Sequence, residues 1–425
     1  MSNARRVALA SAVGTTIEWY DFFIYGTAAA VVFAPQFFPQ ISPLAGTLAS
    51  FATFAIGFVA RPLGGIVMGH LGDRVGRRST LVWCLMLMGG STLAIGLLPN
   101  YATIGLWAPI LLVACRFVQG FALGGEWGGA VLMSVEHAPR HRRGYYGSFV
   151  ALGLPAGIIL SNLVFLLAST LVTPAEFAAW AWRVPFLASV VLVAVGLYVR
   201  LGLAESPVFE AALRAGAPRR LPVVDVLRTN GHTVLLAAGS YLAISALGYL
   251  VIVYFVSYAT GELGFPLTTT LGLLLVAAVA FACSILAFAV WSDRLGRQRI
   301  MRWSNAALIL WALLFFPLID TRSVLLAGVA VCGMLLAQGA YIGPQAAVFA
   351  ELFPTAVRYS GVSLSLTLGT IFGGAIAPFV ATALFSATGR STLVTIYGAT
   401  LAVISWLCVR GLTETYRRDL TEAQS

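Results

Sequence analysis

The chain has 425 residues, of which 59% are hydrophobic and 10% are charged, and its formal net charge is +10. A soluble domain carries about a quarter charged residues, so this composition excludes a protein whose whole surface faces water. The apolar runs are continuous and long enough for spanning helices, which argues against the short alternating strands of a membrane barrel.

Twelve apolar runs of spanning length follow one another along the chain, six in each half. They cover residues 11–34, 48–71, 80–98, 106–134, 146–170, 184–202, 232–258, 268–292, 300–319, 323–348, 359–385 and 391–411. The sequence therefore predicts an all-α polytopic membrane protein of twelve transmembrane helices in two pseudo-symmetric six-helix bundles. We expect the bundles to cover 1–202 and 232–425, with a linker over 203–231 and a short tail at the end.

Arginines are distributed unevenly between the two sides of the predicted spans. One side carries Arg5 and Arg6 and most later arginine clusters, whereas the other holds little beyond Arg183, Arg322 and Arg390. Positive loops stay in the cytoplasm, so we expect both termini to be cytoplasmic and the chain to lie in the plasma membrane. Arginines clustered between apolar runs are typical of such loops and argue against a nucleic-acid partner.

One short charged loop occurs twice, half a chain apart. GHLGDRVGRR at 69–78 has a degenerate copy, WSDRLGRQR, at 291–299, and the matched positions are 220 residues apart. Two parallel repeats joined by a linker are the plan expected of alternating-access transporters. The matched residues are Asp73, Arg74, Gly76 and Arg77 in the first copy, and Asp293, Arg294, Gly296 and Arg297 in the second.

We interpret this loop as a latch. Its aspartate can accept hydrogen bonds from a helix N-terminus or pair with an arginine, and its glycine permits a tight turn. Such a loop would hold helices together in one state and open in the other. The alternative is charge that only fixes membrane topology, which would need no aspartate or glycine at fixed places.

Several motifs resemble a known family of membrane transporters. The loop GHLGDRVGRR resembles the signature loop between helices two and three of the major facilitator superfamily. Four longer stretches are similar to its metabolite:proton symporter family: GTTIEWYDFFIYG at 14–26, GFVARPLGG at 57–65, RFVQGFALGGEWGGA at 116–130 and ELFPTAVRYSG at 351–361. The resemblance implies the twelve-helix fold of that superfamily. It also implies that acids such as shikimate, 2-oxoglutarate or citrate, or proline and betaine, are moved together with a proton.

Charged residues within the predicted spans are candidate functional residues, because each is costly at bilayer depth. They are Glu18, Asp21, Arg61, Arg116 and Glu126, all in the first half. The second half shows no clear charge within its spans. We therefore expect the coupling chemistry in the first half.

Asp21 is the preferred candidate for carrying the proton, with Glu18 and Glu126 as alternatives, since desolvation favours a neutral carboxyl group. Arg116 would bind a substrate carboxylate through its planar guanidinium, or pair with Asp21 when the site is empty. The alternative is a structural ion pair between the first and fourth helices.

Uncharged polar residues could complete a central cavity by hydrogen bonding to substrate, although packing roles remain open for each. Arg61 has two open roles, as a structural tie or in the pathway, and Arg183 is expected to anchor the membrane interface. The polar candidates are Tyr25, Gln119, Tyr249, Gln338, Tyr341 and Gln345.

The sequence predicts proton-coupled uptake of a small organic acid or zwitterion by alternating access. We expect a monomer in the lipid bilayer, driven by the proton gradient, with no cofactor and no metal. No phosphate-binding loop and no set of nucleophile, base and oxyanion donors is found, so ATP-driven transport and enzyme activity are not predicted. The alternatives are a proton-coupled exporter of drugs or secondary metabolites and a non-transporting membrane sensor.

Overall fold

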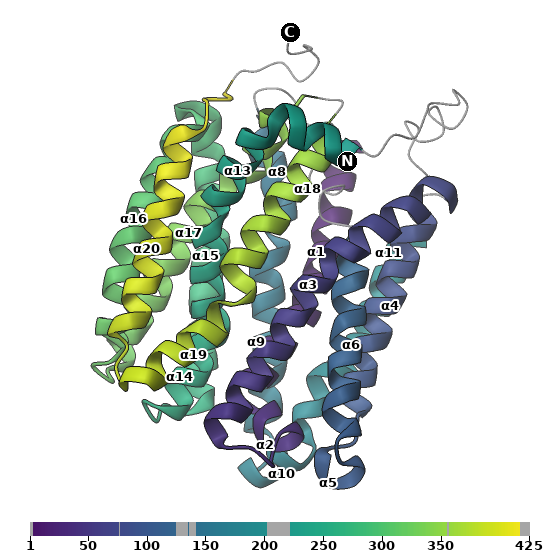
Figure 1. The fold of residues 1–425 in the computed structure, drawn as a ribbon, viewed down its shortest axis with the longest axis vertical. Coiled ribbons are helices and arrows are strands. Elements are labelled where there is room, and N and C mark those ends of the chain that lie inside the picture. Colours follow the sequence, from purple (N-terminus) through teal and green to yellow (C-terminus); the bar gives the residue numbers. More distant parts are fainter. Residues whose placement is uncertain are drawn as a thin grey trace.

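The computed structural model describes residues 3–75, 77–124, 135, 142–201, 222–354 and 357–416. Twelve helical segments run along one common axis, which confirms the predicted all-α fold (Figure 1). The long helices of the first half are α1 (Asn3–Val31), α3 (Pro43–Val75), α4 (Arg77–Leu97), α6 (Trp107–Leu123), the pair α8 (Arg143–Ala151) and α9 (Gly153–Thr170), and α11 (Val184–Leu201).

The second half repeats this plan with longer helices. Its members are α13 (Pro222–Tyr249) with η3 (Leu250–Tyr254) and α14 (Phe255–Gly261), α15 (Leu267–Leu295), α16 (Arg297–Ile319), α17 (Val324–Leu352), α18 (Arg358–Gly369) with η4 (Thr370–Ala375) and α19 (Ala377–Thr388), and α20 (Thr392–Gly411). Three short helices of the first half lie outside the long spans: α2 (Phe33–Phe37), α5 (Tyr101–Ile104) and α10 (Pro174–Ala179). A further short helix, η2 (Ala181–Arg183), leads directly into α11 and belongs to the same span.

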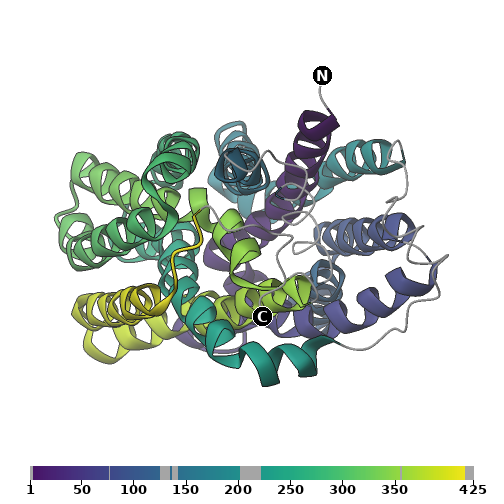
Figure 2. The same ribbon diagram turned by 90° about the horizontal axis from the view of Figure 1, so that it is seen from above.

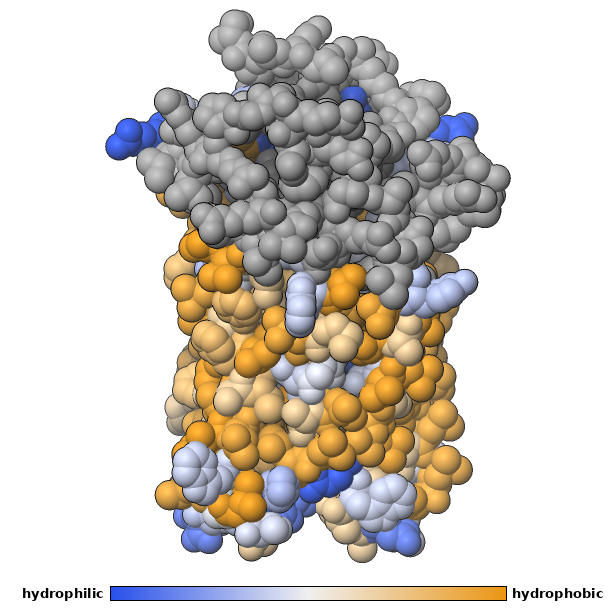
Figure 3. Space-filling view, turned by 90° about the vertical axis from the view of Figure 1, so that its right-hand side faces the viewer, coloured by the Kyte–Doolittle hydropathy of each residue, from blue (hydrophilic) through white to orange (hydrophobic). Residues whose placement is uncertain are grey.

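The helices have the length and surface that a membrane requires. Among the described residues, nine helices are long and apolar enough to span, and Val82–Leu97 and Trp107–Leu123 are shorter apolar helices. These eleven helices and α1 together account for the twelve predicted spans. A broad apolar band covers the middle of the face formed by the first half (Figure 3), as expected for side chains in contact with lipid.

The two halves lie side by side when the bundle is viewed along its axis (Figure 2). They meet where α8 and α9 pack against α15 and α17, where α1 meets η3 and α14, and where α3 meets η4 and α19. The start of α1 and the end of α20 lie at the same end of the bundle, called the termini end below (Figure 1).

The expected linker can be followed only in its last part. Residues 203–221 lie outside the described part of the chain, and α13 begins at Pro222. A break at Asn230, where φ is −127° and ψ is 19°, separates the first two turns of α13 from the long spanning part.

Glycines let α3 and α6 cross almost backbone to backbone. A Cβ atom on Gly120 would lie 1.9 Å from the carbonyl oxygen of Gly57, and one on Gly124 would lie 2.0 Å from that of Arg61. Small residues that recur every four positions permit this approach in membrane helices. Gly120 and Gly124 thus form a close-packing ridge on α6, and Gly128, four residues further along the sequence, lies outside the described residues.

We expect Gly120→Ala to destabilise the protein, because the added methyl group must push the backbones of α3 and α6 apart. Overpacking of this kind costs about 1–3 kcal/mol. The control is Gly90→Ala on α4, where a Cβ meets no atom within 4 Å. The unfolding temperature measured in detergent should fall for Gly120→Ala and not for Gly90→Ala. Equal unfolding temperatures of the two variants would contradict the tight crossing.

Candidate substrate and proton site

Arg116 lies at the centre of the first half, on α6, with 1% of its surface exposed. Its guanidinium carbon lies 4.2 Å from the centre of the Tyr25 ring, 4.4 Å from that of Phe22 and 4.9 Å from that of Phe54. Cation–π contacts are worth about 2 kcal/mol or more when water is excluded. Three rings from α1 and α3 therefore offset part of the cost of burying this charge.

The space for the guanidinium exists because α3 carries glycine at position 57. A Cβ atom there would lie 2.6 Å from Nε of Arg116. One turn away on α3, Thr53 accepts a hydrogen bond of 2.7 Å from the hydroxyl of Tyr25, which fixes that ring against the arginine. The crossing of α3 and α6 thus positions both the charge and one of its aromatic neighbours.

Only part of the hydrogen-bonding capacity of Arg116 is used. Its Nη1 donates to Oε1 of Gln119 at 3.3 Å, whereas Nε and Nη2 are buried without an acceptor among the described residues. Leaving donors of a buried charge unpaired is costly, and such groups point to a binding role.

Asp21 lies nearby on α1, is 2% exposed, and has neither carboxyl oxygen hydrogen bonded within the described structure. Its closest polar surroundings include Thr92 and Arg116. The Thr92 hydroxyl donates to the Met88 carbonyl at 3.0 Å and accepts from Nε2 of Gln119 at 2.7 Å.

Arg116 and Asp21 are not joined by an ion pair within 4 Å in this structure. The expectation that they pair directly in the empty site is therefore not met. Instead, Arg116 bonds to Gln119, and Gln119 bonds to Thr92, which borders Asp21. A polar chain, and not a direct contact, connects the two charged groups.

Aromatic rings carry this region across to the second half. The ring of Phe22 lies 4.9 Å from those of Phe54 and Phe58. Tyr249 of α13 meets all three, with ring centres 5.3–5.7 Å apart. Arg61 lies on the same cluster, 5.0 Å from the Phe22 ring and 4.9 Å from the Phe58 ring.

Tyr249 is held in place by a local change in helix geometry. It is the last residue of α13 before η3, a π-helical segment, and it faces a second π-helical segment, η4. A Cβ atom on Gly374 of η4 would lie 2.3 Å from its ring. Wide turns of this kind often occur at functional sites.

Arg61 and Glu18 belong to the same surroundings. Arg61 interacts electrostatically with Tyr249, Glu18 and Tyr241, and Glu18 is 7% exposed. Arg61 therefore lies between the two halves and beside the candidate site.

The polar residues expected on α17 divide into two kinds. Gln338 and Gln345 are buried, and each has an Nε2 without an acceptor among the described residues. A Cβ atom on Gly248, next to Tyr249, would lie 3.2 Å from Oε1 of Gln338. Tyr341 instead shares a 2.8 Å hydrogen bond with Ser240 inside the second half.

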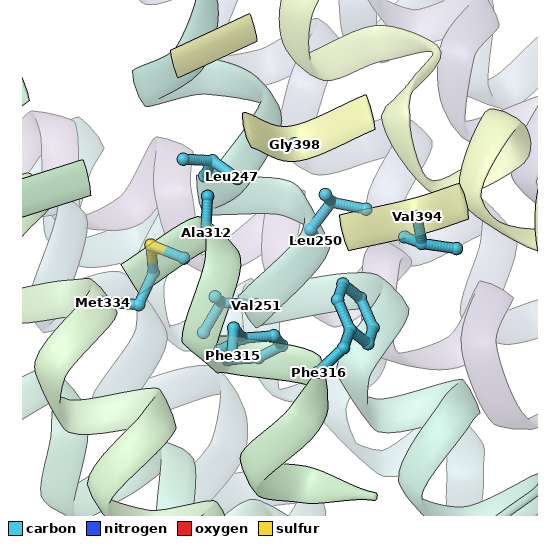
Figure 4. A pocket seen from close by; sticks show the side chains of 9 residues that line it. All are labelled: Leu247, Leu250, Val251, Ala312, Phe315, Phe316, Met334, Val394 and Gly398. Atoms are coloured by element: carbon cyan, nitrogen blue, oxygen red, sulfur yellow. The ribbon is translucent and has the colours of Figure 1, made fainter. Parts of the chain in front are cut away.

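A separate pocket in the second half does not fit a polar substrate. It lies between α13, η3, α16, α17 and α20, and the nine residues that line it are all apolar or glycine (Figure 4). Without a polar side chain it cannot bind a carboxylate, so we interpret it as a packing defect.

The second copy of the repeated loop joins the halves at the termini end. Asp293 accepts hydrogen bonds of 3.0 Å from the backbone N–H groups of Gly144 and Tyr145, at the start of α8. A carboxylate at a helix N-terminus is favoured by the helix dipole. Arg297 donates to Asp293 at 3.0 Å from the first turn of α16.

Glu351 extends this network from the end of α17. It accepts two hydrogen bonds from Arg297, of 2.7 and 3.1 Å, and its Oε1 lies 3.8 Å from Nη1 of Arg143 on α8. The side chains of Glu351 and Arg297 are almost fully buried. The network therefore holds α8 of the first half against α15, α16 and α17 of the second.

Other loop candidates are placed less fully. Gly296 has φ of +97°, a conformation that favours glycine, and Arg294 is exposed. The backbone of Asp73, Arg74 and Arg77 lies at the junction of α3 and α4. Gly76 and Glu126 lie outside the described residues.

Arg183 ties two first-half elements together at the end opposite the termini. Its Nη1 donates to the carbonyls of Gly96 at 3.1 Å and Leu98 at 2.5 Å, where α4 ends. Its guanidinium also stacks 4.4 Å from the Trp182 ring. The contacts favour a structural anchor.

Several site residues were not identified from the sequence. Phe22, Phe54 and Phe58 look like ordinary core residues among 26 phenylalanines, and nothing local marks them as neighbours of a cation. Glu351 and Arg143 did carry a signal in the sequence, because Glu136, Pro139 and Arg143 match Glu351, Pro354 and Arg358 at an offset of 215 residues.

Known proteins resemble this chain over its whole length. The model of the Major Facilitator Superfamily matches residues 11–378. The inner membrane metabolite transport protein YhjE of Escherichia coli (strain K12) is 43% identical, with 99% of this chain and 96% of the relative covered. The shikimate transporter of the same organism is 41% identical, with 91% and 89% covered.

Among solved structures, the D-xylose-proton symporter superposes with a TM-score of 0.78. The match covers 98% of this chain and 99% of the symporter, at 16% sequence identity. Similarity at that level of identity supports the fold alone.

We expect Glu351→Gln to lower the free energy of unfolding by several kcal/mol. Removing one charge of a buried ion pair costs about 3–5 kcal/mol, because Asp293 alone would then face Arg297 and the carboxylate near Arg143 would be lost. The matched control is Glu262→Gln, an exposed glutamate after α14, for which about 0.5 kcal/mol or less is expected. Denaturant unfolding in detergent makes the comparison, and equal losses in the two variants would argue against the network.

Proposed function

The chain belongs to the major facilitator superfamily and is a multi-pass membrane transporter of metabolites, and we propose that it imports a small carboxylate-bearing metabolite together with a proton. The observation that carries this proposal is the pair of unpaired donors on Arg116, buried beside an unpaired Asp21 carboxyl group. A transporter is implied rather than an enzyme, because relatives that are 43% and 41% identical to this chain are named as a metabolite transport protein and a shikimate transporter.

Arg116 is proposed to bind the substrate carboxylate. A guanidinium presents parallel N–H donors that match the two oxygens of a carboxylate. Nη1 is engaged by Gln119, so Nε and Nη2 supply the fork. The relative named as a shikimate transporter supports an acid as substrate, and neutral polar groups such as Gln338 would contact the rest of the molecule.

Asp21 is proposed to carry the proton. Burial without a hydrogen-bond donor favours the neutral acid over the carboxylate. In a state open to water the carboxyl group would be hydrated and could exchange its proton. Asp21 lies close to Arg116 without pairing to it. Release of the Asp21 proton would therefore add a negative charge beside the guanidinium that binds the substrate carboxylate, and would weaken substrate binding.

Movement between states is proposed to occur by alternating access of the two halves. The Asp293–Arg297–Glu351 network with α8 would act as a latch at the termini end, which we propose to be cytoplasmic. Opening that end requires separating Asp293 from the start of α8. We propose that one chain suffices for transport and that the proton gradient alone drives it, with no cofactor.

The direct test is uptake into proteoliposomes of a panel of radiolabelled acids, proline and betaine, under an imposed pH gradient. We expect one carboxylate class to accumulate and a protonophore to abolish accumulation. Binding without flux would instead support a sensor, and flux only out of the compartment that corresponds to the cytoplasm would support an exporter.

Asp21→Asn should abolish proton-driven accumulation and leave substrate exchange, because the amide cannot release a proton. The measurement compares net uptake with counterflow in the same proteoliposomes. Asp320→Asn is the control: Asp320 contacts Tyr258 and Ser391 within the second half, so the same chemical change leaves the site intact. If Asp21→Asn still accumulates substrate, another group carries the proton.

Arg116→Lys should raise KM for the acid by roughly tenfold to a hundredfold, because hydrogen bonds to charged groups contribute about 1.5–3 kcal/mol and lysine lacks the planar fork. The control is Arg390→Lys. Arg390 is exposed at the end of the bundle opposite the termini, so this variant should leave KM unchanged. An unaltered KM with reduced protein stability would assign Arg116 a structural role.

A further inference from the structure

We propose that the first turns of α16 form a binding site for the headgroup of an anionic phospholipid. The site is an open pocket of about 360 Å³ at the termini end, lined by Gln298, Arg299, Arg302, Trp303 and Glu414. It lies outside the substrate region and does not depend on the proposed function.

The positive charges of this pocket are unpaired. Arg299 and Arg302 are exposed, and neither side chain makes an ion pair or hydrogen bond within the described structure. They lie three residues apart, so both side chains project from the same side of α16. Two free guanidinium groups on one helix face provide the donors that phosphate oxygens require.

The acidic residue of the pocket is already engaged. Glu414, which follows α20, accepts hydrogen bonds from the backbone N–H groups of Arg297 and Gln298 at 3.2 and 3.1 Å. Its Oε1 also accepts from the N–H groups of Thr415 and Tyr416, each at 3.0 Å. The carboxylate therefore caps the start of α16, and within the described residues it makes no ion pair with Arg299 or Arg302.

The wall of the pocket is fixed by contacts between α16 and α20. Gln298 donates through Nε2 to the carbonyls of Val409, at 3.3 Å, and Leu412. Because α20 ends with exposed Arg410, stacked 4.8 Å from the Trp406 ring, a further cation and aromatic ring lie at the same end of the bundle.

Lipid is favoured over a soluble phosphate compound because the pocket continues into an apolar face. Trp303, Leu310 and Leu314 are exposed to 56%, 54% and 39%. Their spacing of seven and then four residues places them on one stripe of α16. Tryptophan is enriched at membrane interfaces, where arginines also attract anionic headgroups. A phospholipid whose phosphate binds Arg299 and Arg302 would thus place its acyl chains along this stripe.

The test titrates purified protein in detergent with dioleoylphosphatidylglycerol or dioleoylphosphatidylcholine and counts bound lipid by native mass spectrometry. The variant is Arg299→Gln with Arg302→Gln. The control, Arg228→Gln with Arg390→Gln, removes the same charge from exposed positions on α13 and in the turn between α19 and α20. We expect phosphatidylglycerol binding to fall roughly tenfold or more in the variant and to persist in the control.

Three outcomes would overturn the proposal: equal binding of both lipids to the unmodified protein, an unchanged affinity in the arginine variant, or an equal loss in the control. Inorganic phosphate distinguishes the source of the headgroup chemistry, because displacement of the lipid by phosphate alone would indicate a site for free phosphate. Trp303→Ala provides a second variant and should weaken lipid binding while leaving the unfolding temperature unchanged.

Discussion

The burial of one guanidinium group in an apolar bundle is the constraint on which the rest of the first half depends. Arg116 can remain charged there only because aromatic rings, an amide and a glycine surround it. These groups come from three helices: Phe22 and Tyr25 from α1, Gly57 from α3 and Gln119 from α6. Gly57 leaves space for the guanidinium and also lets the backbones of α3 and α6 approach closely. The packing of these two helices therefore determines both the scaffold and the site.

Two kinds of polar chemistry then occupy two levels of the molecule. At the depth of Arg116 and Asp21, buried groups keep unused hydrogen-bonding capacity, which suits groups that exchange partners during a cycle. At the termini end, Arg297, Glu351 and Asp293 satisfy one another closely, which suits a contact that must hold one state. An unsatisfied buried group favours binding, whereas a satisfied one favours stability.

The fold was predictable because its signals are local in the sequence. Apolar runs mark the spans, and the rarity of charge at depth marks Asp21 and Arg116 without knowledge of their surroundings. The rest was not local. Whether Arg116 pairs with Asp21 or with Gln119 depends on ångström-scale placement of three helices, and the role of Glu414 depends on a chain end that returns to α16.

The π-helical segments were also beyond sequence reasoning, because no residue type specifies a wide turn. They matter because η3 and η4 orient Tyr249 toward Phe22, Phe54 and Phe58. Likewise, phenylalanine in a membrane protein signals an apolar environment and does not reveal whether a cation lies above its ring. Sequence reasoning thus located the charges and left their neutral surroundings undetermined.

The ring contacts of Tyr249 have a consequence for how the two halves separate. Aromatic faces slide and part without leaving a donor or acceptor stranded, so the resistance at that depth is dispersion, which ions in solution barely affect. The contact of Asp293 with the start of α8 is electrostatic, and because the Asp293 side chain is only 8% exposed, dissolved salt screens it weakly. Separation of the halves therefore leaves the aromatic surfaces without stranded polar groups, whereas at the termini end it exposes charged groups that water must then solvate.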